Sequence, residues 1–203
     1  MAIGVDRVNT QLGIVFDFSL WSVDFADGKT KRNHTVLAPF YGQVFAAEFI
    51  GSSLGEDVQV IELAITGDGD GNTGSGALSA YVAYESGRPA RVAVINMQCW
   101  SGMANCSSSE SLSRPSQEVE VSVPKDVKSA LVEKLTSPCG ADAFADQGIT
   151  WDGVSWNTAE NDGIGRQVLD RDDDSVANVT IVNNGTVNVR VGASEAVMVN
   201  LGY

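Results

Sequence analysis

The sequence predicts a mainly β protein, an antiparallel β-sandwich preceded by a short strand and helix. From about residue 56 onward, several short apolar segments are separated by turn residues, which is typical of sandwich strands. The stretch QEVEVSVP (117–124) alternates strictly between apolar and polar side chains, the pattern of a strand with one buried face. No helix of any length is predicted after residue 51.

The first fifty residues show a different pattern, which predicts a strand and a helix. Residues 3–8 form an apolar run that suggests a buried strand. The stretch APFYGQVFAAEFIG (38–51) predicts a helix, because Pro39 suits a first helical turn and Gly51 suits a helix end. Its few polar residues predict that the helix is largely buried.

The strands of the second part are predicted from their apolar pattern. VQVIELAI (58–65) alternates loosely. LSAYVAYESGRPARVAVINM (78–97) contains two apolar runs around a Gly-Arg-Pro turn, which indicate central strands covered on both faces or aromatic and alanine side chains at a crowded interface. KSALVEKLTSP (128–138) fits a helix or a strand, and flanking prolines favour a short strand. The final strand is predicted at 194–201. In the alternating segment, Val119, Val121 and Val123 point inward and Glu118, Glu120 and Ser122 outward.

The stretch ITWDGVSW (149–156) predicts a hairpin. Asp152 and Gly153 fit a two-residue type I′ turn, which pairs Trp151 with Val154. The hairpin is therefore predicted to be half-buried, with one aromatic face. That face carries Ile149, Trp151, Val154 and Trp156, and the other face carries Thr150 and Ser155.

A second hairpin is predicted in ANVTIVNNGTVNVRV (177–191). A three-residue loop that ends with Gly185 in the left-handed conformation gives the better register. This register pairs Ile181 with Val187, Val179 with Val189 and Ala177 with Val191. It leaves Asn178 and Asn184 at exposed positions.

Composition and charge limit the classes of molecule that the protein is expected to bind. The 203 residues suit one all-β domain, or one domain with part of another. The net charge of -13 repels phosphate backbones and anionic lipids, so neither nucleic acid nor a membrane is an expected partner. No apolar run has the length of a transmembrane helix.

Four N-x-S/T sequons favour a secreted glycoprotein, with Asn33, Asn105, Asn178 and Asn184 as the acceptors. The N-terminus has no basic region, apolar segment or cleavage site of a signal peptide. Sequons without a signal peptide predict that an N-terminal portion of a longer, secreted protein precedes this chain.

The three cysteines cannot all pair with one another. Cys99 and Cys106 bracket a short loop and are the preferred disulfide. Cys139 would then be free, or would pair with a residue missing from this chain. The absence of a C-x-x-C pattern and the single histidine argue against a Cys/His zinc site.

The remaining motifs predict no metal or cofactor site. The loop GDGDGNTGSG (67–76) starts with the spacing of a calcium loop but lacks its glycine at position six and its glutamate at position twelve. The only histidine, His34, lies in a polar loop without a recognisable Ser-His-acid pattern. Glycine-rich phosphate motifs between a strand and a helix are absent.

Paired carboxylates are the simplest catalytic machinery that the sequence could contain, because glycoside hydrolysis needs two acids. The pattern places the candidates on a helix face, on strands and in a turn, and nothing brings two of them into one cleft. These candidates are Glu48, Glu62, Glu85 and Asp152. No catalytic residue is therefore assigned.

Trp151 and Trp156 fit two interpretations. They could form a platform for stacking a sugar, or they could cap the core of the sandwich. The core is favoured, because the same hairpin face carries Ile149 and Val154.

Six segments together resemble the C-terminal region of glycoside hydrolase family 79, the β-glucuronidase-like enzymes. They are YGQVFAAEFIG (41–51), AYVAYESGRPARVAVIN (80–96), RPSQEVEVSVP (114–124), LTSPCGADA (135–143), GITWDGVSW (148–156) and ASEAVMVNL (193–201). The resemblance implies a β-sandwich at 51–203 that follows a catalytic (β/α)8 barrel. It also implies that residues 1–50 are the remnant of the last barrel unit, with a strand at 4–8 and a helix at 39–50. The family's two catalytic glutamates lie on earlier strands, which this chain lacks.

The leading hypothesis is a non-catalytic region of a secreted β-glucuronidase-like retaining hydrolase. It would pack against and stabilise a barrel that is missing from this chain. The alternative is a standalone carbohydrate-binding module that binds glycans through Trp151 and Trp156. Independent enzymatic activity is not expected, because no acid/base pair is placed.

Overall fold

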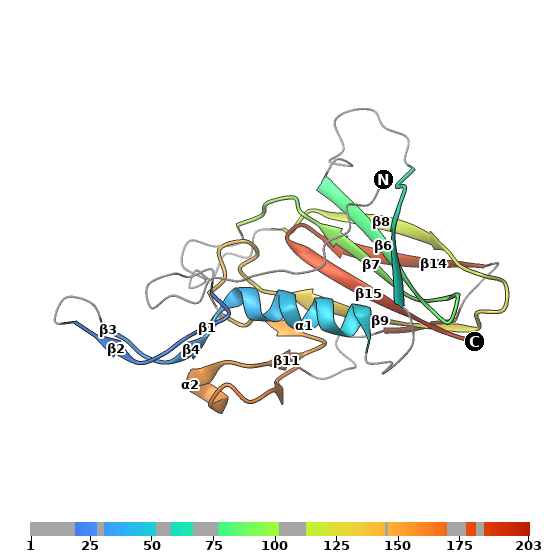
Figure 1. Ribbon diagram of the computed structural model, residues 1–203. Helices are drawn as coiled ribbons and strands as arrows, with labels where there is room; N and C mark the ends of the chain where they lie inside the picture. The colour runs from blue at the N-terminus through green and yellow to red at the C-terminus, as the bar shows by residue number, and fades with distance from the viewer. Residues whose placement is uncertain are drawn as a thin grey trace.

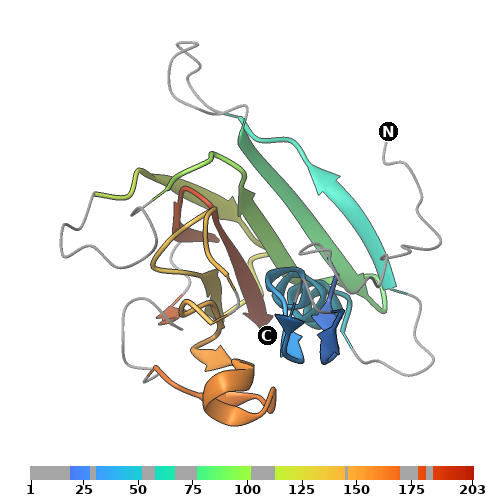
Figure 2. The ribbon, with the colours of Figure 1, turned by 90° about the vertical axis from the view of Figure 1, so that its left-hand side faces the viewer.

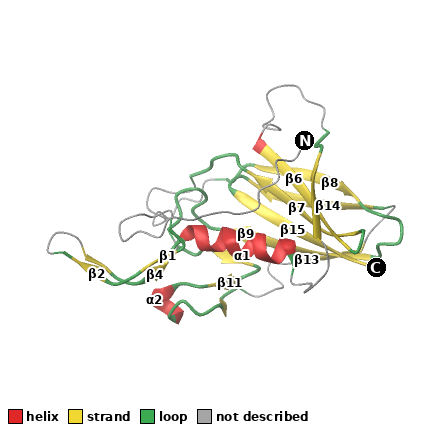
Figure 3. Cartoon of the chain, viewed as in Figure 1, coloured by secondary structure: helices red, strands yellow, loops and turns green. Residues whose placement is uncertain are grey.

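The computed structural model describes residues 19–27, 31–51, 58–66, 77–101, 113–144, 146–169, 178–181 and 185–203. Strands dominate these residues, and helix α1 is the main exception (Figures 1 and 3). In chain order the elements are β1 (Trp21–Ser22), β2 (Phe25–Ala26), β3 (Lys31–Arg32), β4 (Thr35–Val36), α1 (Ala38–Ile50), β5 (Val58–Leu63), β6 (Leu78–Glu85), β7 (Arg88–Asn96), β8 (Ser116–Ser122), β9 (Ser129–Thr136), β10 (Thr150–Trp151), β11 (Val154–Ser155), α2 (Thr158–Asn161), β12 (Arg166–Gln167), β13 (Asn178–Ile181), β14 (Thr186–Gly192) and β15 (Glu195–Gly202).

One antiparallel sheet forms the centre of the molecule. Within the described residues its strand order is β12-β11-β10-β9-β15-β7-β6-β5, and β13 also pairs with β9. The C-terminal strand β15 lies between β7 and β9, so Val197 pairs with Val94 on one side and with Lys134 on the other. The predicted final strand thus becomes a central strand, and the ambiguous segment at 128–138 is confirmed as a strand.

A second layer packs on one face of this sheet. It consists of β8 and β14, which pair over seven residues from Thr186–Ser122 to Gly192–Ser116. The core between the layers is rich in valine, because β-branched side chains pack well between pleated surfaces. Val121 is buried while Glu118 and Glu120 are exposed, which confirms the alternation predicted for 117–124. The predicted antiparallel β-sandwich is confirmed.

Helix α1 covers the opposite face of the central sheet (Figure 2). Tyr41, Phe45 and Phe49 are buried at four-residue spacing, so they lie along one stripe of the helix. The stripe packs on small or flexible side chains, among them Ala83 and Ala93, which leave room for the aromatic rings. These residues form a second core cluster, separate from the valine-rich core.

The ends of α1 agree with the prediction, but its burial does not. Pro39 lies in the first turn, and Gly51 follows the last residue with a φ of 82° and donates its N–H to Ala47 O at 2.9 Å. The prediction of a largely buried helix is wrong, because most of its outer face is exposed, including Ala46 and Ile50.

The turn between β6 and β7 lies one residue earlier than predicted. Ser86 and Gly87 occupy it with φ values of 51° and 77°, and Arg88 and Pro89 already belong to β7. Two consecutive positive φ values are typical of the type I′ turn, whose twist matches that of the paired strands. The valines and alanines of both strands are buried against α1 or the second layer, as the apolar pattern indicates.

The hairpin at 149–156 has the predicted turn and register. Asp152 and Gly153 have φ values of 48° and 74°, and Trp151 pairs with Val154. Its predicted half-burial is wrong, because Thr150 and Ser155 are also buried. The hairpin is interior to the sheet, with β9 on one side and β12 on the other, and α1 contacts it through Tyr41, whose hydroxyl lies 3.3 Å from that of Ser155.

The predicted hairpin at 177–191 is wrong. β13 pairs with β9 in the central sheet, whereas β14 pairs with β8 in the second layer. β14 forms seven cross-strand pairs with β8, and β13 forms four with β9, so pairing with distant strands replaces the local turn. Gly185 does have the predicted positive φ, of 77°. Residues 182–184 of the expected loop are outside the described residues.

A four-residue helix, α2, also departs from the prediction of no helix after residue 51. Asn157 precedes it, and its Oδ1 accepts a hydrogen bond from the Ala159 N–H at 2.9 Å, the usual role of asparagine at a helix start. Residues 3–8 and the glycine-rich loop at 67–76 lie outside the described residues. The barrel strand at 4–8 and the domain boundary after residue 50 therefore stay predictions.

Candidate functional site

An open groove of about 820 Å³ lies beside the N-terminal end of α1. One wall is a ribbon of two antiparallel strand pairs, β1 with β4 and β2 with β3, which projects beyond the helix (Figure 1). The opposite wall consists of the described residues Ala143, Phe144, Asp146 and Gln147, and the residues around the start of α2 line the groove between them. The groove is thus built from segments more than a hundred residues apart in the chain.

Hydrogen bonds hold the ribbon in shape. The buried Ser22 hydroxyl donates to the Asn33 carbonyl at 3.1 Å. One oxygen of Asp24 accepts the His34 backbone N–H at 2.7 Å and lies 3.0 Å from His34 Nδ1. Both side chains of this pair are exposed to solvent, so its electrostatic contribution is screened. The hydrogen bond from the His34 backbone is the main reason why the pKa of Asp24 lies below its ordinary value.

The ribbon is joined directly to the β domain. The Val36 N–H donates to Thr158 Oγ1 at 3.0 Å, across 122 residues of sequence. The Leu37 N–H donates to the Leu20 carbonyl at 2.9 Å, which closes the base of the ribbon just before α1 begins. The ribbon is therefore anchored to the residues at the start of α2, which also line the groove.

The opposite wall presents an exposed aromatic ring. Phe144 is 60% exposed, although two hydrogen bonds fix its backbone. Its N–H donates to Gln147 Oε1 at 2.9 Å, and its carbonyl accepts the Gln147 N–H at 3.0 Å. A solvent-exposed aromatic ring on a groove wall is a candidate contact for a ligand.

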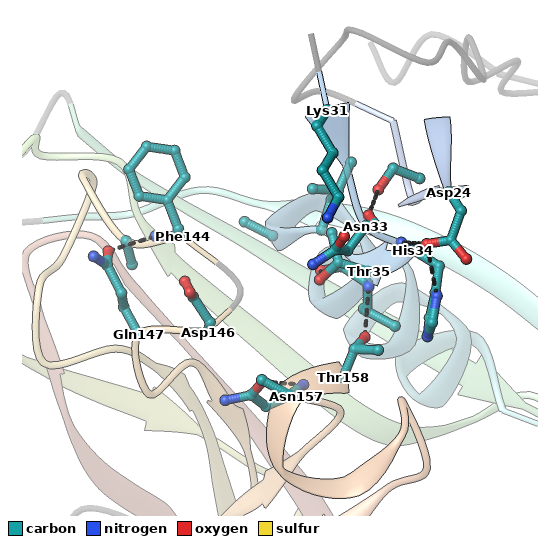
Figure 4. Close-up of a pocket in the computed structure, with 16 residues that line it drawn as sticks. Asp24, Lys31, Asn33, His34, Thr35, Phe144, Asp146, Gln147, Asn157 and Thr158 are labelled. Carbon is teal, nitrogen blue, oxygen red and sulfur yellow. Dashed lines mark hydrogen bonds and ion pairs between the residues drawn. The ribbon is translucent and has the colours of Figure 1, made fainter. Parts of the chain in front are cut away.

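The other groups that line the groove are a mixture of apolar, polar and charged side chains. Figure 4 shows Lys31, Asn33 and Thr35 on the ribbon side and Phe144, Asp146 and Gln147 across from them. Amides, hydroxyls and one aromatic ring suit a ligand that carries many hydroxyl groups and a small apolar face. Within the part of the chain that the structure describes, no three His, Cys, Asp or Glu side chains gather as metal ligands would.

The comparison with known families concerns the sandwich, which contributes one wall of this groove. The model of the glycosyl hydrolase family 79 C-terminal beta domain matches residues 80–198, which run from β6 into β15. The chain belongs to this family. Apart from β5, the strands of both layers lie within or overlap the match, whereas the ribbon, α1 and β5 precede it.

Curated relatives of this family 79 chain are annotated by name as β-glucuronidases. It is 28% identical to the β-glucuronidase of Aspergillus niger over 202 residues, 97% of this chain and 34% of that protein. It is 30% identical to the β-glucuronidase of Neurospora crassa over 172 residues, 77% of this chain and 30% of that protein. The chain thus spans about a third of the length of these relatives.

A solved structure supports the fold of the family 79 chain. The 4-O-α-L-rhamnosyl-β-D-glucuronidase of Fusarium oxysporum superimposes with a TM-score of 0.58 at 22% identity, over 82% of this chain and 30% of that one. At this identity the similarity concerns the fold alone.

The two tryptophans occupy different places in the family 79 fold. Trp151 is only 5% exposed and packs with Phe45 in the cluster under α1, so its ring offers no surface to a sugar. Trp156 is half-buried, and its ring meets Tyr41 and Phe40 edge-on, with centroid distances of 5.5 and 5.7 Å. Both rings nevertheless pack in or against the same cluster under α1, which agrees with the favoured interpretation that they belong to the core and not to a sugar platform.

The predicted disulfide is corrected. Cys99 is exposed and has a free thiol, whereas the buried Cys139 is disulfide-bonded. Closeness in sequence favoured Cys99 and Cys106, but a disulfide requires a suitable spatial approach of two Cβ atoms. Cys106 itself lies outside the described residues.

Of the four sequons, the structure describes the surroundings of one. Asn33 is exposed and lines the groove. Asn178 lies in β13, and its side chain is outside the description. Asn105 and Asn184 also lie outside the described residues. Glycosylation of all four stays a prediction.

The four candidate acids are spread over the molecule. Glu48 is exposed on α1 and Glu62 is exposed on β5. Glu85, at the end of β6, forms an ion pair with Arg91, and Asp152 is buried in the β10–β11 turn. No two of these four share the groove.

Sequence reasoning missed the groove itself. Phe144 and Gln147 lie in an irregular turn with no periodicity, and the ribbon strands have only two residues each. The sequon at Asn33 was the one sequence signal that pointed to this region. Among the described residues, none of the helices has the length and apolarity to cross a membrane.

Proposed function

We propose that this chain is the non-catalytic C-terminal β domain of a secreted β-glucuronidase-like glycoside hydrolase. Its role is to pack against the catalytic barrel of the whole enzyme and to stabilise it. The names of the relatives support β-glucuronides as the substrate class of that enzyme. The chain spans about a third of their length, which leaves room for a barrel in the remainder.

The observation that carries this proposal is the exposed apolar surface on the helix side of the central sheet. Ile50, at the end of α1, is 51% exposed. Val60 on β5 is 44% exposed and pairs with Ala83, whose side chain belongs to the cluster under α1, so Val60 lies on the same face. Exposed apolar groups on adjoining elements are typical of a surface that another part of a protein covers.

A binding experiment tests this packing role. The chain is expected to enhance the fluorescence of a hydrophobic dye, and a separately produced catalytic barrel is expected to abolish the enhancement. Ile50→Glu and Val60→Glu should weaken association with the barrel at least tenfold, because each buries a charge in the interface. Ile164→Glu is the matched control, since Ile164 is 70% exposed in the loop between α2 and β12.

Two results would contradict the proposal. One is a monomer that does not enhance the fluorescence of the dye and does not associate with the barrel. The other is hydrolysis of an aryl β-glucuronide by the purified chain alone, which would assign catalysis to residues of this domain. Secretion is tested separately, by finding the protein in the culture fluid of its source.

The positions of the two tryptophans give little support to the alternative of a standalone carbohydrate-binding module. The buried ring of Trp151 cannot stack on a sugar without unfolding of the α1 cluster. Glycan binding to the chain that disappears in Trp156→Ala would restore that alternative.

A further inference from the structure

We propose that the groove holds an N-linked glycan carried by Asn33, with its first sugar against the ring of Phe144. This assigns a modification site and an occupant to the groove. The inference goes beyond packing against a barrel, and it rests only on the proposed passage of the protein through a secretory pathway.

Asn33 is well placed for this modification. It begins the sequon Asn33-His34-Thr35, and its side chain is exposed. Its main chain is anchored, because the Asn33 carbonyl accepts the Ser22 hydroxyl. Figure 4 shows Asn33 and Thr35 on the ribbon, and both line the groove, as do His34 and Asp24, which contact each other at 3.0 Å. A sugar attached to Asn33 would therefore start inside the groove.

The covalent step is the ordinary glycosyl transfer to an asparagine amide. The Asn33 Nδ2 atom bonds to the anomeric carbon of an oligosaccharide that is carried on a lipid diphosphate. The bond between that carbon and the diphosphate oxygen breaks, the lipid diphosphate leaves, and the amide nitrogen loses one proton. Folding does not oppose this modification, because the exposed Asn33 side chain is not needed in the core.

The groove contains an aromatic ring and polar groups that an N-acetylglucosamine residue could contact. This sugar has an apolar face of C–H groups and an acetamido methyl, and both can cover part of the exposed ring of Phe144. Its hydroxyl groups can bond to the amides and hydroxyls that line the groove, among them Thr158 and Asn157. The volume of about 820 Å³ exceeds that of a single sugar and lies within the usual range of ligand sites.

The first experiment asks whether Asn33 is modified. The full chain is secreted from a glycosylating eukaryotic host behind a cleavable leader, and its peptides are analysed by mass spectrometry after enzymatic deglycosylation in heavy-oxygen water. Conversion of Asn33 to labelled aspartate is expected. An unmodified Asn33 would overturn the proposal, and Asn33→Gln is the negative control for the peptide assignment.

The second experiment asks where the glycan lies. In the proton NMR spectrum of the glycosylated chain, the acetamido methyl of the first sugar should show an upfield ring-current shift and a contact to the Phe144 ring. Phe144→Ala should remove both signals, and Ile164→Ala should leave them unchanged, because Ile164 is equally solvent-accessible but does not line the groove.

Two outcomes of the second experiment would overturn the proposal. One is a glycan whose methyl shift is the same in the wild type and in Phe144→Ala, which would mean that the glycan projects into solvent. The other is binding of an added free saccharide to the groove of the glycosylated chain, which would mean that the groove is vacant for a ligand. Neither outcome depends on association with the barrel, so the two proposals fail independently.

Discussion

The ring of Phe45 meets the ring of Trp151 edge-on, with centroids 5.2 Å apart and an interplanar angle of 86°. This contact joins α1, near the start of the chain, to β10, more than a hundred residues later. Both rings belong to the cluster that fills the space between α1 and the central sheet. The helix that the resemblance assigns to a barrel is therefore also part of the core of the β domain.

Truncation of either ring should strongly destabilise the chain. Phe45→Ala or Trp151→Ala is expected to lower the free energy of unfolding by about 3–5 kcal/mol, because each change leaves a cavity under α1. Equilibrium unfolding in urea measures this loss. Trp21→Ala is the control, because Trp21 lies largely exposed on the ribbon. A loss below about 1 kcal/mol at Phe45 would contradict the packing of α1 on the sheet.

Arg114 should be far more important for stability than Arg190. The guanidinium of Arg114 is partly buried, forms an ion pair with Glu195, donates to the Ser137 carbonyl and lies over the ring of Trp100 at 4.2 Å. Arg114→Ala is expected to cost about 3–5 kcal/mol, because it leaves Glu195 without its cation in a poorly solvated place.

Arg190 provides the matched control for that prediction. Its ion pair with Glu118, at 3.9 Å, is exposed on both sides, so Arg190→Ala should cost less than about 1 kcal/mol. Thermal unfolding of the two variants in the same buffer measures the difference. Equal losses of stability in the two variants would contradict the expectation that the buried ion pair contributes more than the exposed one.

Replacement by alanine should change the stability in opposite directions at Gly42, within α1, and at Gly51, which follows it. A Cβ atom on Gly42 would meet open space, so Gly42→Ala should raise stability by up to about 1 kcal/mol through better helix propensity. Gly51 has a φ of 82° and a ψ of 171°, a conformation largely restricted to glycine, and its Cβ atom would lie 2.7 Å from Glu85 Oε1.

Gly51→Ala should therefore lower stability by about 1–3 kcal/mol. It would also disturb Arg91, whose Nε donates to the Phe49 carbonyl at 2.7 Å at the end of the helix. Circular dichroism during urea unfolding compares the two alanine variants with the wild type. A stabilised Gly51→Ala would show that the helix end differs from the one described.

The hydrogen bonds from His34 predict a pH effect on the ribbon. They lower the pKa of Asp24 relative to the unfolded chain, so the stabilisation is fully present above the ordinary carboxyl pKa of about 4. It is lost as the pH falls through the lower folded pKa. Carboxyl carbon shifts in an NMR titration measure this pKa.

His34→Ala should raise the pKa of Asp24 only part of the way to its ordinary value. The largest cause of the shift is the backbone N–H of residue 34, which the substitution retains. Full return to the ordinary value in His34→Ala would show that the imidazole, and not the backbone, holds the carboxylate.

The candidate site illustrates what sequence reasoning could reach. A sequon is a local pattern, so Asn33 was found as a candidate without the structure. Phe144 could not be found, because an aromatic residue in an irregular segment carries no sign of exposure. Its place across the groove from Asn33 is a product of the tertiary structure, which no local pattern encodes.

The sequence by itself determined the elements whose cause is local. Side-chain alternation placed β8 with its valines inward, Pro39 and Gly51 bounded α1, and Asp152-Gly153 set the register of β10 and β11. Each of these depends on neighbouring residues and on the period of a helix or strand.

Only the tertiary structure decided which strands pair and what each face touches. β13 and β14 join different layers although a turn could have linked them, because each pairs with a strand from a distant part of the chain. Thr150 and Ser155 are buried because their hairpin lies inside the sheet, and Cys139, not Cys99, forms the disulfide. Such outcomes depend on competition among non-local contacts, which neighbouring residues do not reveal.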